Sequence, residues 1–274
     1  MFRNLLKVNN IFISLLFFPT IYLSGWVLIN FLVNYLPFLD LEKSLYGTII
    51  TFILFLFFLP SWSKNRWNKN LFKIIKVQGN NKKNLICSLF FEFLKALIII
   101  YIFIFLLIKG NLVFFSINLN ENIILNGLFL GTFVGIAEEL VFRVWLFEEL
   151  NLFFSPKRAN LYQAILFSLV HYRHDYSLIS NFLLFIGLFL LGLYLNTWRL
   201  RKNPSILLPV VFHGSLVGVW FLLNNSLSLI NKIPSVLFGP GYGVNINPIG
   251  GLAGIIVLFL LNIFQKRYIS KYNF

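Results

Sequence analysis

The residues best suited to chemistry are two adjacent carboxylates and a guanidinium inside an apolar segment. The stretch AEELVFR covers residues 137–143, and it is preceded by ILNGLFLGTFVGI and followed by VWLF, which carry no charge. On an α-helix, Glu139 and Arg143 lie four residues apart on nearly the same face and are expected to pair, whereas Glu138 points about 140° away from Arg143. Glu138 is therefore the carboxylate that is left to exchange a proton with water or with a substrate.

Two histidines are predicted to lie at the same depth as Glu138. Counting about 1.5 Å per residue from the cytoplasmic helix ends places Glu138 about 14 Å, His171 about 16 Å and His213 about 12 Å into the membrane. A carboxylate can take a proton from water, and two imidazoles can position that water, polarise a carbonyl or hold a metal. Together these groups predict a site for peptide-bond hydrolysis that needs no serine or cysteine nucleophile.

Other interpretations of these charged and polar groups stay open. Both glutamates could share Arg143 in a buried ion network that only orders a helix bundle, although ionisable groups within membranes often mark functional sites. Either histidine alone is typical of a satisfied polar residue between membrane helices. Proton-coupled transporters also carry buried glutamate and histidine, but they favour an inverted internal repeat, and the sequence has no such symmetry.

The composition predicts the elements that must position these groups. The 274 residues are 58% hydrophobic and 12% charged, with a mean hydropathy of +0.81, which is too apolar for a soluble domain. The sequence therefore predicts an all-α, polytopic integral membrane protein that forms a single domain over residues 1–274. Eight apolar segments are expected to be transmembrane helices. They cover 11–37, 46–61, 86–108, 124–147, 160–172, 178–198, 205–223 and 248–264.

Glycines in the fourth segment predict close helix packing. Gly127, Gly131 and Gly135 recur every four residues, and one more step of the same spacing reaches Glu139. A stripe of small residues lets the backbone of a neighbouring helix approach.

The distribution of basic residues predicts the topology. With the N-terminus inside, 17 of the 23 Lys and Arg residues fall in inner segments and four in outer ones. This asymmetry predicts that both termini are cytoplasmic. The net charge of +14 suits anionic lipid headgroups on the inner leaflet, so no nucleic-acid partner is expected.

Two motifs in order resemble a known family. Residues 138–143, EELVFR, match an EExxxR motif, and residues 167–171, FSLVH, match an FxxxH motif. In this membrane context they resemble the CAAX-protease and bacteriocin-processing (Abi, CPBP) family of intramembrane peptidases, with a catalytic core over 124–223. The resemblance implies that Glu138 is a general base that activates water. It also implies that His171 and His213 position the water and the substrate carbonyl, with Glu139 and Arg143 as an orienting pair.

The third motif departs from the family's pattern. The family usually has HxxxN or HxxxD, but His213 is followed four residues later by Val217, which has no polar group. Three alternatives follow: a peptidase with a reduced oxyanion site, one in which water, Asn181 or Asn196 fills the gap, or a member that no longer cleaves peptides.

The sequence thus predicts an intramembrane endopeptidase that resembles CAAX prenyl proteases, in a bacterial plasma membrane. Its expected partners are the lipid bilayer and a membrane-embedded or membrane-associated peptide or protein substrate. A prenylated CAAX protein gives the family its name, but the sequence does not identify the substrate. No cofactor is required by the motifs, and a divalent metal such as zinc stays an open option. A non-catalytic membrane binding or immunity protein of the same fold is the main alternative.

Overall fold

The computed structural model describes residues 11–35, 43–75, 82–116, 119–200 and 205–272, and these are mostly helical. Each of the eight predicted segments contains a helix. The helices are α2 (Ile11–Val33), α3 (Lys43–Arg66), α5 (Lys82–Lys109), α6 (Glu121–Glu138), α8 (Pro156–Leu169), α9 (Leu178–Asn196), α10 (Leu207–Asn224) and α12 (Leu252–Tyr272). Shorter helices are α4 (Leu71–Ile75), α7 (Phe147–Leu150) and α11 (Ser235–Phe238). The end of the first predicted segment at residue 37 and the basic residues Arg3, Lys7, Lys76, Arg201 and Lys202 lie outside the described residues.

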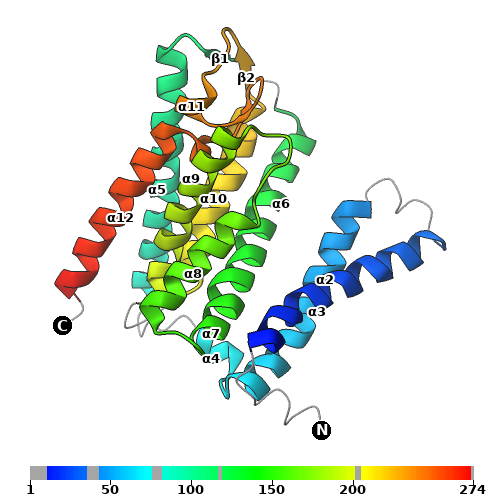
Figure 1. Ribbon diagram of the computed structural model, residues 1–274. Helices are drawn as coiled ribbons and strands as arrows, with labels where there is room; N and C mark the ends of the chain where they lie inside the picture. The colour runs from blue at the N-terminus through cyan, green and yellow to red at the C-terminus, as the bar shows by residue number, and fades with distance from the viewer. Residues whose placement is uncertain (1–10, 36–42, 76–81, 117–118, 201–204, 273–274) are drawn as a thin grey trace. The chain divides into compact units, whose positions relative to one another are not determined.

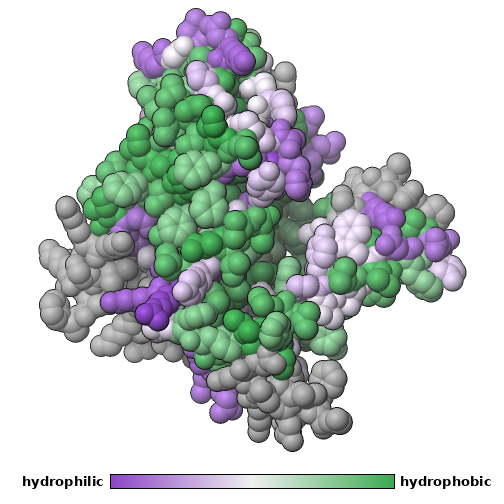
Figure 2. All heavy atoms as spheres, in the orientation of Figure 1, coloured by the Kyte–Doolittle hydropathy of each residue, from purple (hydrophilic) through white to green (hydrophobic). Residues whose placement is uncertain are grey.

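Six helices of the described chain are long and apolar enough to cross a bilayer. The apolar part of α12, Leu252–Gln265, is shorter, and α8 has 14 residues, which corresponds to about 21 Å along its axis. Large apolar side chains are exposed along the flanks of the helices, and Figure 2 shows them as a continuous apolar surface on the helical bundle. Because water cannot solvate such a surface, the chain is an integral membrane protein with an all-α fold.

The chain divides into two compact units. The first contains residues 1–75 and 148–154, and the second contains residues 76–147 and 155–274. Each is described below by itself, and the single domain over 1–274 stays a prediction.

In the second unit, α10 lies at the centre of the bundle. It packs against α6 and α5, while α9 packs against α8 and α12 (Figure 1). A buried apolar cluster joins these helices. It includes Phe167 of α8, Leu188 and Leu191 of α9, Phe212 of α10 and Leu258 of α12.

The predicted glycine stripe is the contact between α6 and α10. A Cβ atom on Gly131 would lie 2.8 Å from the carbonyl oxygen of Gly214, and one on Gly135 would lie 3.0 Å from the Cα of Gly214. Gly218 meets the same stripe one turn further along, where its added Cβ would lie 3.0 Å from the Cα of Gly131. The two backbones are therefore in direct contact, which a side chain on either helix would prevent.

The fourth predicted segment is not a continuous α-helix. After Glu138 the chain continues as a π-helix, η2 (Glu139–Leu146), before α7 resumes α-helical geometry. A π-helix has more residues per turn than an α-helix, so side chains beyond Glu139 are rotated from the positions that α-helical spacing predicts, although the pair of Glu139 and Arg143 still forms. Short π segments are rare and often lie at functional sites.

Two small two-stranded sheets and a short helical turn cover one end of the second unit. Strand β1 (Val113–Phe115) pairs antiparallel with β2 (Leu227–Leu229), with Phe114 opposite Ser228 (Figure 1). Strand β3 (Gly241–Tyr242) pairs with β4 (Asn245–Ile246), and Gly243 between them has a φ of +61°, which glycine adopts without strain. Asn247 then caps the 3-10 turn η4 (Pro248–Gly250) by accepting a hydrogen bond from the Ile249 amide at 3.2 Å.

In the first unit, a buried charge network surrounds Glu149. The indole groups of Trp62 and Trp67 both donate to Glu149 Oε1, at 2.6 and 2.7 Å. Arg66 Nε lies 3.3 Å from Oε2 of the same carboxylate, and Ser14 also donates to that oxygen. Four donors on one buried carboxylate connect α2 and α3 to the segment that directly follows the π-helix in the sequence.

Candidate active site

The structure brings the predicted acid and both predicted imidazoles together. Oε2 of Glu138 lies 3.7 Å from Nε2 of His171 and 3.9 Å from Nε2 of His213. Glu138 ends α6, His171 follows α8, and His213 lies on α10, so three segments of the second unit converge on one point. The two imidazoles present the same ring atom, Nε2, to the same carboxylate oxygen.

The second nitrogen of each ring determines what Nε2 can do. Nδ1 of His171 lies 2.6 Å from the backbone carbonyl oxygen of Phe167, and Nδ1 of His213 lies 2.8 Å from Oε1 of Glu139. Carbonyl and carboxylate oxygens only accept, so each Nδ1 carries the hydrogen and donates it. In the neutral rings, Nε2 is therefore an unprotonated acceptor. Three acceptor atoms face one another, and a water molecule that donates to two of them satisfies this arrangement.

Glu139 and Arg143 form the predicted ion pair, and the pair reaches His213. Both side chains are completely buried, and Arg143 Nη1 lies 3.2 Å from Glu139 Oε1. The same oxygen accepts the hydrogen bond from His213. Glu139 thus links the buried Arg143 guanidinium to the His213 imidazole on α10. The EExxxR motif alone does not predict this link between two helices.

The aromatic ring of Phe167 fills the space between the charged groups. It is fully buried, with its centroid 4.2 Å from the Arg143 guanidinium carbon and 4.7 Å from the His171 ring centroid. The ring face stabilises the guanidinium through a cation–π contact and excludes water from it. The phenylalanine of the FxxxH motif therefore contacts both the Arg143 guanidinium and the imidazole of the motif's own histidine, His171.

His171 does not lie within a membrane helix, which corrects the predicted segment 160–172. Helix α8 ends at Leu169, and His171 lies in the turn that follows. Asn181 holds the next part of this loop, since its side chain accepts from the Arg173 amide at 3.0 Å and donates to the Arg173 carbonyl at 2.8 Å. Burial raises the pKa of Tyr176 in the same loop above the ordinary tyrosine value, and the Asp175 carboxylate raises it further. The phenol is thus a neutral donor at physiological pH.

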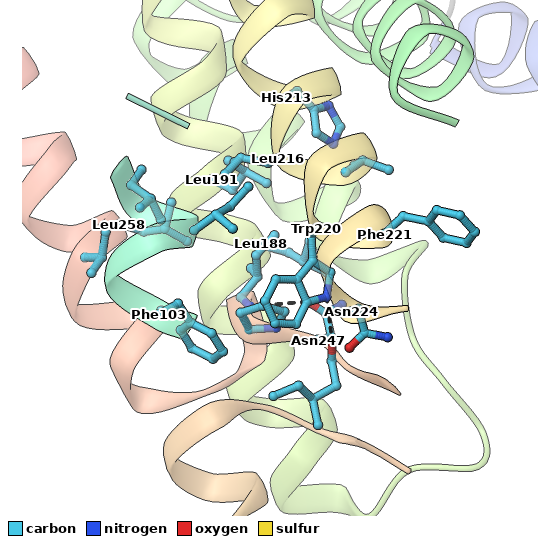
Figure 3. A pocket seen from close by; sticks show the side chains of 18 of the residues that line it. Phe103, Leu188, Leu191, His213, Leu216, Trp220, Phe221, Asn224, Asn247 and Leu258 are labelled. Atoms are coloured by element: carbon cyan, nitrogen blue, oxygen red, sulfur yellow. Dashed lines mark hydrogen bonds between the residues drawn. The ribbon is translucent and has the colours of Figure 1, made fainter. Parts of the chain in front are cut away.

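An apolar cavity of ≈ 450 Å³ opens onto Glu138, His171 and His213. Leu188 and Leu191 of α9 and Leu216 and Trp220 of α10 form part of its wall (Figure 3). Further polar groups line the part of the cavity away from His213. They are Asn224, Asn245 and Asn247.

The third-motif position lies in this cavity. Val217 lines it one helical turn beyond His213, so an apolar side chain is present where the family's pattern has an amide or a carboxylate. Neither suggested substitute is among the residues that line the cavity. Asn181 bonds to the loop at Arg173, and Asn196 donates to Asn160 at 2.9 Å. Of the three groups suggested to fill the gap left by Val217, which were water, Asn181 and Asn196, water is the one that remains.

The described residues contain no group of three or more His, Cys, Asp or Glu side chains arranged to hold a metal ion. Chelation tests metal dependence directly.

Comparison with known families agrees with the motifs. Residues 120–219 match the family model of the type II CAAX prenyl endopeptidase Rce1-like domain. The Rce1-like region confirms the resemblance drawn from EExxxR and FxxxH, and it contains every residue of the candidate site. These are Glu138, Glu139, Arg143, His171 and His213. Residues 4–71 match a second model, a domain of unknown function (DUF8676). No curated protein and no solved structure matches the chain.

Three features of the site and its cavity depend on the folded structure. The bond between Glu139 and His213 joins residues 74 positions apart, so no local pattern signals it. Asn224 had a weak signal, because it lies on the same helical face as His213, but its place in the same cavity needed the folded structure. Tyr176 carried no signal.

Proposed function

We propose that the protein is an intramembrane endopeptidase that hydrolyses a peptide bond with water activated by Glu138. The observation that carries the proposal is the convergence of Glu138 Oε2 with the Nε2 atoms of His171 and His213, at the wall of an apolar cavity. The match of residues 120–219 to a CAAX prenyl endopeptidase family model supports a membrane protease.

The residues divide the chemical work as follows. Glu138 takes a proton from water as the water oxygen attacks the substrate carbonyl carbon, and the resulting tetrahedral intermediate collapses when that proton reaches the leaving amine nitrogen. One O–H of the water points to Glu138 Oε2, and the other donates to the Nε2 lone pair of His171 or of His213, which orients the water. When an imidazole is protonated, the same Nε2 donates to the developing oxyanion.

Glu139 and Arg143 act indirectly in this proposal. The Glu139 carboxylate holds His213 in the tautomer with hydrogen on Nδ1, and it stabilises the imidazolium when His213 is protonated. Arg143 pairs with Glu139 at 3.2 Å and compensates its charge in a fully buried position. Both are positioning residues.

The cellular location, the topology and the class of substrate follow from the same proposal. The protein would act in a bacterial plasma membrane with both termini in the cytoplasm, on a membrane-embedded or membrane-associated peptide or protein. Helix α8 ends after 14 residues and leaves His171 in the loop that follows, where the His171 side chain is 27% exposed. This exposure supports the access of water to the site. Non-helical backbone at membrane depth is tolerated where it lines a water-filled cavity.

The test is hydrolysis of a peptide library by the purified protein in detergent, with and without a chelator. Glu138→Gln keeps the shape of the side chain but removes the base, so we expect kcat to fall by a factor of about 10² to 10⁴ while the protein stays folded. His171→Ala and His213→Ala should each lower kcat by nearly as large a factor. The double variant should lose far less than the product of the two single factors, because the groups act as one unit. Glu121→Gln, at the exposed start of α6, is the matched control and should leave the rate unchanged.

Val217 favours a second candidate, a membrane binding or immunity protein that keeps the fold without cleaving peptides. An apolar residue one turn from His213 removes a polar partner from the site. This candidate takes the place of the first if the wild-type protein hydrolyses no peptide and Glu138→Gln leaves the biological phenotype intact.

A further inference from the structure

The loop that carries His171 is exposed along most of its length. It connects α8 to α9, and the four residues that follow His171 are all exposed, namely Tyr172, Arg173, His174 and Asp175. Side-chain packing therefore contributes little to the backbone conformation of this loop. Nε2 of His171 nevertheless lies 3.7 Å from Oε2 of Glu138, a distance that suits two groups sharing a water molecule. Another interaction must hold the loop in this position.

The side chain of Asn181 makes four hydrogen bonds to the loop. Its Oδ1 accepts from the backbone amide of Arg173 at 3.0 Å, and its Nδ2 donates to the carbonyl oxygen of the same residue at 2.8 Å. Nδ2 also donates to the carbonyl oxygens of Tyr176 at 3.1 Å and of Ser177 at 3.3 Å. One side chain thus binds both backbone polar groups of Arg173, which is two positions after His171.

Asn181 belongs to a well-packed helix. It is 8% exposed and lies near the start of α9, where the Ser177 side chain caps the helix by accepting from the Ser180 amide. Leu184 and Leu188 of the same helix are part of the buried apolar cluster of the second unit. A polar side chain on such a helix places the loop that it binds more precisely than the loop could place itself.

The chain is also fixed on the other side of His171. The backbone amide of His171 donates to the Ser168 carbonyl at 3.2 Å, and its Nδ1 bonds to the Phe167 carbonyl at 2.6 Å. Tyr172 alone separates His171 from Arg173, so the two anchors leave the backbone at His171 little freedom. Without the bonds from Asn181, the imidazole can move away from Glu138. A displacement of about 1 Å at a reacting group can lower the rate about 10²-fold.

We propose that Asn181 is a positioning residue of the candidate active site. It is not among the residues that line the cavity, and it acts through the backbone of Arg173, which keeps the His171 imidazole beside Glu138. The effect of Asn181 on catalysis rests on the proposed function, whereas its effect on the position of His171 does not.

The first test compares the kinetics of Asn181→Leu with those of the wild-type protein in detergent. Leucine has a similarly branched side chain but can neither donate nor accept a hydrogen bond. For a library peptide that the wild-type protein cleaves, we expect kcat to fall about 10- to 100-fold, with a smaller change in KM. Asn225→Leu is the matched control, because Asn225 also donates to a backbone carbonyl, that of Phe221, but is exposed and does not line the cavity.

A second variant keeps the test decisive if Asn181→Leu does not fold. Asn181→Asp preserves the shape of the side chain and an acceptor for the Arg173 amide, but it removes the Nδ2 donor to three carbonyl oxygens. We expect it to lower kcat as well. Thermal unfolding of each variant establishes that the assay temperature lies below the melting temperature.

NMR of the histidine rings tests the position of His171 without turnover. The chain has three histidines, so protein labelled at histidine gives ring signals from His171, His174 and His213, which are assigned by replacing each in turn with alanine. We expect Asn181→Leu to shift the His171 signals more than those of His213, whose Nδ1 bonds to Glu139 on another helix.

An unchanged kcat in a folded Asn181 variant, or His171 signals that stay at their wild-type positions, would overturn the proposal. A rise in KM alone would overturn it as well, because the effect of Asn181 would then lie at the cavity wall formed by Tyr176. The proposed function fails separately. If the wild-type protein hydrolyses no peptide, the NMR comparison still decides whether Asn181 positions His171.

Discussion

The imidazole of His213 and the carboxylate of Glu139 form a buried hydrogen bond, with Nδ1 2.8 Å from Oε1, between two helices whose backbones touch. The contact is short because Gly131 and Gly135 face Gly214, so that α6 and α10 approach without side chains between them. The π-helix begins at Glu139, at the point where this side chain must reach α10. The close packing of α6 and α10 and the change to a π-helix at Glu139 thus both position the hydrogen bond between Glu139 and His213.

Replacing the buried cation should destabilise the protein. Arg143→Ala leaves the fully buried Glu139 without its charge partner, which costs about 3–5 kcal/mol of unfolding free energy for a buried pair. Thermal unfolding in detergent measures the loss, and Arg158→Ala, at an exposed position on α8, is the control. Unchanged stability in both Arg143→Ala and Glu139→Gln would remove the orienting role.

The glycine contact makes a separate prediction. Gly131→Ala places a methyl group 2.8 Å from the Gly214 carbonyl oxygen, so α10 must move away and His213 with it. We expect a loss of about 1–3 kcal/mol in stability together with a fall in peptide hydrolysis. Leu125→Ala, on the exposed face of the same helix, should leave hydrolysis intact. Wild-type activity and melting temperature in Gly131→Ala would contradict the tight contact.

A polar group at the third-motif position should increase activity. Val217→Asn introduces an amide one turn beyond His213, inside the cavity, where it can donate to an oxyanion. A single such donor is worth about 10²- to 10³-fold in rate, which sets the upper limit of the gain in initial-rate assays. Val217→Ile keeps the position apolar and should show no gain. If both variants behave alike, the position does not face the reacting carbonyl.

The network around Glu149 should stabilise the first unit. Glu149→Ala removes the acceptor shared by Trp62 and Trp67 and strips Arg66 of a buried partner carboxylate, so a loss of about 3–5 kcal/mol is expected. Glu149→Gln should lose less, because its amide oxygen still accepts from the indoles. Limited proteolysis of the first unit reports the change, with Glu121→Ala as the control. Equal protease resistance in all three variants would show that the network contributes nothing measurable.

The topology prediction is tested with inserted tags. The 17-to-4 division of basic residues predicts that tags at residue 75 and at the C-terminus are cytoplasmic, whereas a tag near residue 235 is external. Cysteine labelling of intact cells locates each tag. An external C-terminus would mean that one predicted segment does not cross the membrane, and the common depth of Glu138, His171 and His213 would then have another origin.

The sequence by itself determined the features that depend on neighbouring residues. Apolar runs identified all eight helical segments, because a membrane helix satisfies its own backbone hydrogen bonds and needs only length and apolar side chains. A spacing of four residues predicted that Glu139 pairs with Arg143, and three glycines spaced four residues apart predicted a close helix contact.

The tertiary structure decided what depends on distant residues. Helix spacing could not reveal that the chain changes to a π-helix at Glu139, that α8 ends before His171, or that His213 bonds to Glu139 from another helix. The bond between His213 and Glu139 joins residues 74 positions apart, so it depends on a partner that local sequence does not specify. The cavity from Glu138 to Asn224 exists because segments far apart in sequence meet, since six helices and the β3–β4 hairpin must pack before its two polar ends face one space.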